Sequence, residues 1–208
     1  GDAMFVKSYQ LLAQCEAVIL PQLLAVFSST ALQVCEGQQH DMDFENRAEV
    51  SELEYINMIQ LKTSVLLGCA LKMGAIVGGA DEKDAEYLYQ FGLLLGTSFQ
   101  IKDDVLDCFG EQQKVGKQVG GDILANKKTL LLIHALRTAQ GEVAAELNQW
   151  IAKKDANPAE KVAAVKGIYQ HLKTEEYANA QMDFYYKKAI ENLDTVSASA
   201  QQKKPLYA

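Results

Sequence analysis

The segment FQIKDDVLD, residues 99–107, lies within a long apolar stretch that predicts a buried helix. It carries three carboxylates close together, at Asp103, Asp104 and Asp107. On a helix of 3.6 residues per turn, Asp103 and Asp107 stack one turn apart, and Asp104 precedes Asp107 by three positions. The spacing therefore predicts that all three side chains reach one point on the face of one helix.

Three carboxylates in apolar surroundings need a cationic partner. Like charges at this spacing repel each other, and burying them without a counter-ion costs free energy. Mg²⁺ prefers oxygen ligands and usually shares its coordination shell with water and phosphate groups. A solvated acidic face on a surface helix is the simpler alternative, but the apolar neighbours Phe99, Val105 and Leu106 disfavour it. The segment therefore predicts a magnesium-bridged diphosphate site.

Composition limits the class of protein and its partners. The chain has 208 residues, of which 49% are hydrophobic and 23% charged, as expected for one large soluble domain or a substantial part of one. A net charge of −7 argues against nucleic acid as a partner, because that binding needs a basic surface. No apolar run is long enough to predict a membrane span, and no signal peptide is visible. The cysteines form no CxxC pair, which predicts a reducing, cytoplasmic location; they are Cys15, Cys35, Cys69 and Cys108.

The pattern along the chain predicts an all-α protein. Residues 22–157 contain no proline, and strict apolar–polar alternation is nowhere sustained. Ser51 with Glu54, Asp81, and Asn157 before Pro158 are typical helix starts. We expect residues 38–50, after Gly37, to form a loop or partly helical link, and residues 111–121 to form a loop. The expected helices span about 2–20, 21–35, 51–77, 81–108, 122–138, 142–153, 158–172 and 174–193.

Other polar side chains interrupt apolar segments near the acidic cluster. Lys62 and Thr63 stand in an otherwise apolar helix, where the lysine either meets a phosphate or extends along the helix edge to solvent. Gln100 immediately precedes the acidic cluster. Lys117 and Lys127 follow it in and after a glycine-containing loop, which could fold over phosphates.

Two other patterns are weak. Acidic side chains at positions 41, 43, 45, 49 and 52 have the spacing of a Ca²⁺-binding loop, but such a loop needs glycine where Asn46 stands. We therefore expect a solvated charged link there. The three histidines are far apart, and His134, within an apolar run, is expected to be a core residue rather than a metal ligand.

Taken together, these segments resemble a known family. Residues 99–107, Gly116-Lys117, Asp122 and residues 126–130 (NKKTL) resemble the second aspartate-rich region of trans-type polyprenyl diphosphate synthases, which include farnesyl and geranylgeranyl diphosphate synthases. Residues 55–63 (YINMIQLKT) resemble the family's Lys-Thr helix, and residues 37–41 (GQQHD) its GQxxD segment. The resemblance is colinear from residue 1 to about residue 140.

The resemblance implies an isoprenoid-synthase-type helical bundle that is incomplete. Residues 1–208 would form the C-terminal part of a single polyprenyl synthase domain, without its N-terminal helices and its first aspartate-rich motif. We therefore expect this fragment alone to be inactive. The whole enzyme would condense an allylic diphosphate with isopentenyl diphosphate into a linear isoprenoid diphosphate, with Mg²⁺ as cofactor, as a homodimer.

The resemblance also assigns roles to individual residues. Mg²⁺ would be bound by Asp103 and Asp107 with Asp104 in support. Thr63 and Gln100 would steady the developing allylic cation with their oxygens. The side chains that contact the diphosphate or line its cavity would be Lys62, Lys117, Lys127, Gln38 and Asp41.

Two other functions stay open at this point. The chain could be a non-catalytic helical subunit of a prenyl synthase, although such a subunit has no need of buried charges. It could also be a relative of terpene cyclases, which ionise an allylic diphosphate too. The Lys-Thr and Gly-Lys segments favour chain elongation over cyclisation.

Overall fold

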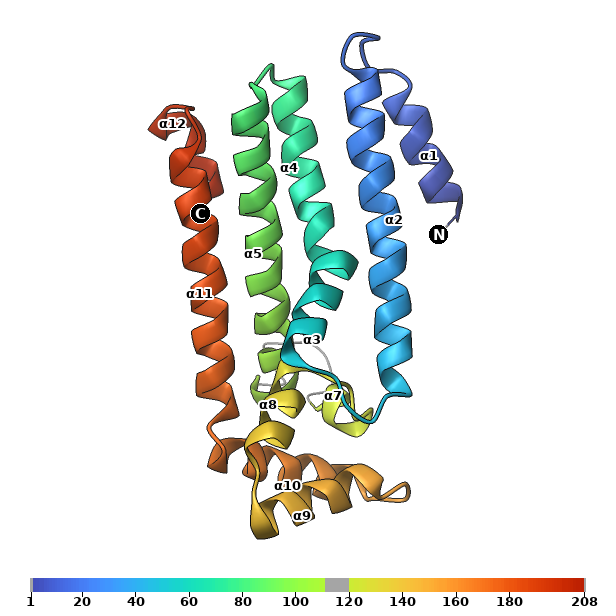
Figure 1. Cartoon of the computed structure of the whole chain (residues 1–208), viewed down its shortest axis with the longest axis vertical. Helices are drawn as coiled ribbons and strands as arrows, with labels where there is room; N and C mark the ends of the chain where they lie inside the picture. Colours follow the sequence, from blue (N-terminus) through green and yellow to red (C-terminus); the bar gives the residue numbers. More distant parts are fainter. Residues whose placement is uncertain (1, 111–119, 208) are drawn as a thin grey trace.

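The computed structural model describes residues 2–110 and 120–207, and within them the chain is helical without strands. Figure 1 shows α1, α2, α4, α5 and α11 as a row of roughly parallel rods, with α9 and α10 lying across one end. The all-α prediction is confirmed. The elements are α1 (Asp2–Leu12), α2 (Leu20–Glu45), α3 (Glu52–Ile59), the π-helical turn η1 (Gln60–Ser64), α4 (Val65–Val77), α5 (Glu82–Phe109), α7 (Gly121–Leu124), α8 (Leu130–Thr138), α9 (Gly141–Ala152), α10 (Pro158–His171), α11 (Thr174–Thr195), α12 (Ala200–Lys203) and the 3₁₀ turn η2 (Lys204–Leu206).

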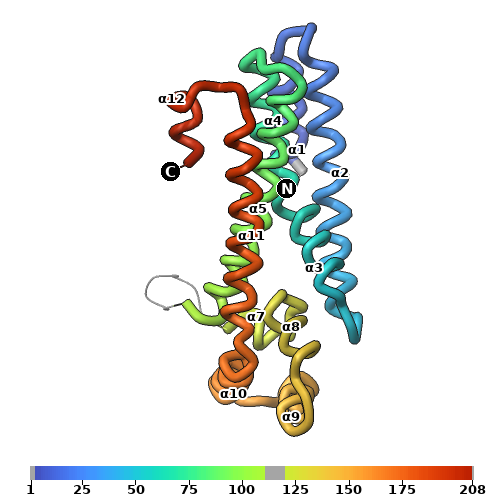
Figure 2. The backbone as a smooth tube through the Cα atoms, turned by 60° about the vertical axis from the view of Figure 1, so that its left-hand side comes forward, coloured from blue at the N-terminus to red at the C-terminus, as the bar shows by residue number. Residues whose placement is uncertain are grey.

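Helix α5 is central to the bundle. It packs along α11 on one side and along α4 on the other, and α2 packs against α4 and η1 (Figures 1 and 2). Its start is capped by Asp81, whose carboxylate accepts the Asp84 N–H at 2.8 Å. The long helix predicted from the sequence over 81–108 is therefore confirmed.

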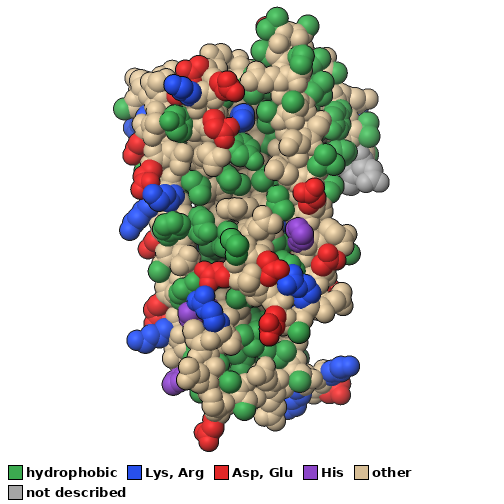
Figure 3. Space-filling model, viewed as in Figure 1, with side chains coloured by type: hydrophobic (Ala, Val, Ile, Leu, Met, Phe, Trp, Pro, Cys, Tyr) green, Lys and Arg blue, Asp and Glu red, His purple; other side chains and the backbone are tan. Residues whose placement is uncertain are grey.

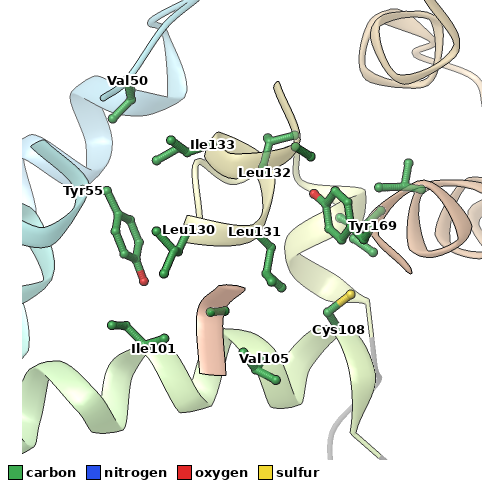
Figure 4. Close-up of a cluster of buried hydrophobic side chains, with 14 of the residues drawn as sticks. Val50, Tyr55, Ile101, Val105, Cys108, Leu130, Leu131, Leu132, Ile133 and Tyr169 are labelled. Atoms are coloured by element: carbon green, nitrogen blue, oxygen red, sulfur yellow. The ribbon is translucent and has the colours of Figure 1, made fainter. Parts of the chain in front are cut away.

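The largest buried apolar cluster lies where α3, α5, α8, α10 and α11 meet. Tyr55, Ile101, Leu130 and Leu131 are fully buried there, and Figure 4 shows the Tyr55 side chain directed from α3 toward α5. Complete burial of a large apolar side chain typically contributes about 1.5–3 kcal/mol to the stability of the fold. This core fixes α3 and α5 against each other at the level where the polar residues of the two helices face one another.

Helix α2 corrects the sequence prediction. We expected Gly37 to end a helix and residues 38–50 to form a link, but α2 continues through Gly37 to Glu45. Gly37 is buried, and a Cβ there would overlap the backbone nitrogen of Lys62 and lie 2.7 Å from the Leu61 carbonyl carbon. The glycine therefore allows close helix packing rather than ending the helix. The helical path also excludes a Ca²⁺-binding loop.

Three further boundaries differ from expectation. The first helix ends at Leu12 rather than near residue 20. The predicted helix over 51–77 starts at the expected capping box of Ser51 and Glu54, but it contains the π-helical turn η1. The predicted helix over 122–138 is divided into α7 and α8 by residues 125–129.

One helical stretch among the described residues, Glu52–Val77, is long and apolar enough to cross a membrane by length and composition alone. In the structure this stretch comprises α3, η1 and α4, and α4 packs along α5 within the bundle. Core helices of soluble bundles often have this composition. The absence of a membrane span stays a prediction.

Candidate functional site

A small polar cavity lies between α2, α3, η1, α5 and the loop that follows α7. Its volume is about 40 Å³. Six of the residues predicted from the sequence line it, although they are spread over almost ninety positions of the chain. The lining residues are Asp41, Tyr55, Met58, Ile59, Lys62, Thr63, Gln100, Asp104 and Lys127.

Lys62 and Thr63 reach the cavity from the π-helical turn η1. The Val65 N–H donates to the Gln60 carbonyl oxygen, five residues back, so the turn holds one residue more than an α-helical turn. Such π-turns are rare and frequently occur at functional sites. Gly37 of α2 lies directly against this turn.

Lys62 forms an ion pair with Asp41 of α2. The distance from Lys62 Nζ to Asp41 Oδ2 is 2.5 Å, and both side chains are partly buried. Lys62 is therefore held inside the cavity instead of extending along the helix edge to solvent. Because Asp41 follows Gly37 by four residues, it stands one turn further along the same side of α2.

A hydrogen-bonded chain runs across the cavity from Thr63 to Tyr55. The Thr63 hydroxyl donates to Gln100 Oε1 at 3.3 Å, and the Gln100 amide donates to Asp104 Oδ1 at 3.3 Å. The Tyr55 hydroxyl donates to Asp104 Oδ2 at 2.6 Å. Both carboxylate oxygens of Asp104 therefore have donors, and this carboxylate fixes the orientation of Gln100.

The Tyr55–Asp104 pair is deeply buried, with exposed fractions of 1% and 3%. Burial raises the pKa of Asp104 to about 6, although the Tyr55 hydrogen bond and the attraction of Lys127 lower it. Burial, followed by the charge of Asp104, raises the pKa of Tyr55 well above its ordinary value. Tyr55 was not predicted to be a site residue from the sequence. The sequence feature that could have indicated it is its position two turns before Lys62 on an apolar helix face.

The three aspartates of α5 do not meet at one point, which corrects the expectation drawn from their spacing. Asp103 is exposed, Asp107 is half-buried, and Asp104 faces Tyr55. The reason is that neighbouring helix positions differ by about 100° in direction. Within the described ranges no group of three or more His, Cys, Asp or Glu residues is arranged to hold a metal ion.

Asp107 and Asp122 join α5 to α7. The Asp122 N–H donates to Asp107 Oδ2 at 2.9 Å, and the Gly120 N–H donates to the Asp107 carbonyl oxygen. Burial raises the pKa of Asp122, and the nearby charges of Asp107 and Asp103 raise it further, against the attraction of Lys127. This corner of the site therefore carries an excess of negative charge that suits a divalent cation.

Lys127 enters the cavity from the loop between α7 and α8. Its Nζ lies 3.6 Å from Asp122 Oδ1. Burial lowers the pKa of Lys127, but the attraction of Asp104, Asp122 and Asp41 outweighs it and the pKa is raised. The cavity thus holds two ammonium groups, those of Lys62 and Lys127, each beside a carboxylate.

Three of the described residues predicted from the sequence do not line the cavity. They are Asp103, Asp107 and Gln38, and Gln38 is exposed on α2. Lys117 lies outside the described residues. His134, expected to be a core residue, is partly buried in α8 with its ring stacked on Tyr177 at 4.0 Å between centroids.

The fold and the site thus define a helical bundle whose inner cavity combines lysines with carboxylates. The sequence profile of the polyprenyl synthetase family matches residues 1–169, and the chain belongs to this family. The expectation of a trans-type polyprenyl diphosphate synthase relationship is confirmed. Among solved structures, a geranylgeranyl pyrophosphate synthase superimposes with a TM-score of 0.93 at 44% identity, over 99% of this chain and 64% of that chain. The chain therefore has the all-α isoprenoid synthase fold.

Curated relatives carry related names. The geranylgeranyl diphosphate synthase of Methanosarcina mazei is 42% identical over 137 residues, which is 65% of this chain and 42% of the relative. The geranylgeranyl diphosphate synthase of Sulfolobus acidocaldarius is 32% identical over 206 residues, which is 96% of this chain and 61% of the relative. The chain thus spans less than two thirds of the length of these relatives.

Proposed function

We propose that the protein carrying this chain condenses an allylic diphosphate with isopentenyl diphosphate, in a Mg²⁺-dependent reaction, to give a linear isoprenoid diphosphate. One observation carries this proposal beyond family membership. The helical stretch that brings Lys62 and Thr63 to the cavity also brings Leu66 and the residues after it to an apolar groove. An allylic diphosphate has the same two parts, a charged head and a hydrocarbon tail.

The apolar groove begins one turn after Thr63. Leu66, Ala70 and Met73 follow at intervals of three and four residues, which places them on one side of α4. The groove has a volume of about 420 Å³, and Leu66 is 52% exposed. Figure 3 shows hydrophobic side chains reaching the surface between the charged ones on one face. The residues that line the groove are Ser8, Leu11, Leu12, Cys15, Phe27, Leu66, Cys69, Ala70 and Met73.

Lys62 and Lys127 are the groups that bind the diphosphate. Each ammonium group is paired with a carboxylate, Asp41 or Asp122, and its remaining N–H donors can bind diphosphate oxygens. Fixed ammonium groups stabilise the negative charge that builds up as the diphosphate leaves. Because Lys62 lies one turn before Leu66 on the same helical stretch, a diphosphate bound by Lys62 places its hydrocarbon tail beside α4.

Asp103 and Asp107 are the residues of α5 that would hold Mg²⁺. Two carboxylates, completed by water and phosphate oxygens, match the coordination that Mg²⁺ prefers. The Asp122 N–H fixes the orientation of the Asp107 carboxylate. A bound ion would supply positive charge to neutralise the departing diphosphate. Asp104, with both oxygens already hydrogen-bonded, orients Gln100 instead of binding the ion.

Thr63 and Gln100 present oxygen atoms to the carbon end of the diphosphate. Oxygen dipoles stabilise a developing allylic cation without capturing it, since neither group is a strong nucleophile. The hydrogen bond between them fixes both side chains. Once the hydrocarbon tail fills the apolar groove beyond them, that tail shields the cation from water until the double bond of isopentenyl diphosphate attacks and a proton passes to the released diphosphate.

Three broader proposals accompany this function. Residues 1–208 form the C-terminal part of a single polyprenyl synthase domain, which agrees with the share of the relatives that the chain spans. The protein is a homodimer, supported by exposed apolar side chains on α1 and α2, namely Met4, Phe5, Val6, Leu11 and Leu32. It is cytoplasmic, in keeping with four free cysteines.

Incubation of the whole protein with labelled isopentenyl diphosphate and an allylic primer tests the function. We expect elongated linear diphosphates that require Mg²⁺ and disappear in the Lys62→Ala variant. A cyclic hydrocarbon product would support a terpene cyclase. Absence of turnover by a folded protein would support a non-catalytic subunit. The Lys154→Ala variant, altered at an exposed lysine outside the cavity, is the control.

A further inference from the structure

Lys161 is a buried lysine on α10 that does not line the cavity. Its exposed fraction is 5%, and its Nζ donates to Asn126 Oδ1 at 2.8 Å and to the Leu124 carbonyl oxygen at 3.4 Å. No ion pair involves it in the part of the chain that the structure describes. Burying an ammonium group without a carboxylate is costly, so packing alone does not explain a lysine here.

Asn126, the partner of Lys161, has an unusual backbone conformation. Its φ is +50°, in the left-handed region that favours glycine. It ends α7 in a Schellman motif, in which the Asn126 N–H donates to the Ile123 carbonyl oxygen and the Lys127 N–H to that of Asp122, at 3.2 and 3.0 Å. A glycine would satisfy this backbone turn.

The Asn126 side chain makes two contacts that glycine could not make. Its amide donates to the Ile151 carbonyl oxygen at 3.1 Å, and its Oδ1 accepts from Lys161. Asn126 is therefore tied to α9 through Ile151 and to α10 through Lys161. The next residue in the chain is Lys127, whose side chain lines the cavity.

We propose that Asn126 and Lys161 are positioning residues that hold Lys127 at the diphosphate-binding cavity. The left-handed turn sets the direction in which the chain leaves α7, and the two side-chain contacts fix that turn against α9 and α10. Helix α10 thus supports the cavity through Lys161 without lining it. This inference rests on the proposed function, in which Lys127 binds a diphosphate.

Calorimetric titration of the whole protein with inorganic pyrophosphate and Mg²⁺ tests the inference through a double-mutant cycle. Lys127→Ala should weaken binding by about 10- to 100-fold, the loss expected for one charge-assisted hydrogen bond. Lys161→Met, which keeps the apolar stem, should weaken binding by about tenfold. Combined with Lys127→Ala, it should cause no further loss, because it acts through Lys127. Lys154→Met, at an exposed position, is the matched control and should bind as the unchanged protein does.

A second variant covers the case in which Lys161→Met does not fold. Asn126→Gly permits the left-handed turn and removes only the side-chain contacts. It should fold, as judged by its thermal transition, and should lose pyrophosphate affinity to a similar degree. A purely structural role would lower the transition temperature and leave the affinity of the folded protein unchanged.

The outcomes separate this inference from the proposed function. If Lys127→Ala leaves pyrophosphate binding unchanged, the proposed function of the cavity fails and the inference fails with it. If Lys127→Ala weakens binding but folded Asn126→Gly and Lys161→Met do not, the inference alone is overturned. A loss from Lys161→Met that is undiminished in the Lys127→Ala background also overturns it.

Discussion

Replacement of Gly37 by alanine tests the packing of α2 against η1. An added Cβ would overlap the Lys62 nitrogen and lie 2.7 Å from the Leu61 carbonyl carbon and 2.8 Å from the Leu61 Cβ. Two of these three atoms belong to the backbone, so no side-chain rotation relieves the overlap. The helices must separate, and overpacking of this kind typically costs about 1–3 kcal/mol.

Two effects of opposite sign compete in the Gly37→Ala variant. In a helix without tertiary contacts, alanine is more favourable than glycine by about 1 kcal/mol. We expect the overlap to outweigh this gain, so the free energy of unfolding should fall by up to about 2 kcal/mol. The variant should also bind pyrophosphate more weakly, because separation of the helices moves Asp41 and Lys62 apart.

Urea denaturation followed by circular dichroism measures the stability change. Gly74→Ala is the matched control, since Gly74 lies within α4 and a Cβ there would meet nothing within 4 Å. The control should raise the free energy of unfolding by about 0.5–1 kcal/mol. Stabilisation of both variants would refute the close approach of α2 to η1.

Three further predictions concern the charged groups of the site. The pKa of Asp104 is raised to about 6, so ionisation of this carboxyl opposes folding. The protonated carboxyl therefore stabilises the protein fully below about pH 4, and this stabilisation is lost as the pH rises to about 6. Denaturation measures the difference in free energy of unfolding between the Asp104→Asn variant and the unchanged protein at pH 4 and at pH 7. Between these two pH values the difference should shift by up to about 3 kcal/mol in favour of the variant. The same difference at both pH values would contradict the burial of an ionisable carboxyl. Asp103→Ala should abolish Mg²⁺-dependent pyrophosphate binding in calorimetry, and retained binding would remove Asp103 from the metal site. Lys62→Met should weaken pyrophosphate binding by about tenfold or more, whereas equal binding by both proteins would show that the lysine serves only its ion pair with Asp41.

Helix starts were predictable because their signals are local. Ser51 with Glu54, Asp81 and Asn157 cap α3, α5 and α10 as expected, since each side chain bonds to backbone groups within three residues. The polar residues of the site were also recognisable. Lys62, Thr63 and Gln100 stand out in apolar helices, where a polar group without a function is costly.

Contacts between distant segments were not predictable. Gly37 predicted a helix end, yet its structural role depends on the close approach of Lys62, which lies 25 residues later in the chain. The role of Asn126 likewise depends on Lys161 of α10. Local sequence carries no information about which backbone approaches a given position.

The sequence by itself determined that this protein is helical and that lysines and carboxylates interrupt its apolar helices, because helix preference and caps act over a few residues. The tertiary structure decided which of these charges share one cavity. It turned Asp104 toward Tyr55 and away from Asp103, and it brought Asp41 to Lys62. Those outcomes depend on how closely α2, α3 and α5 pack, and that distance is set by side chains far apart in the chain.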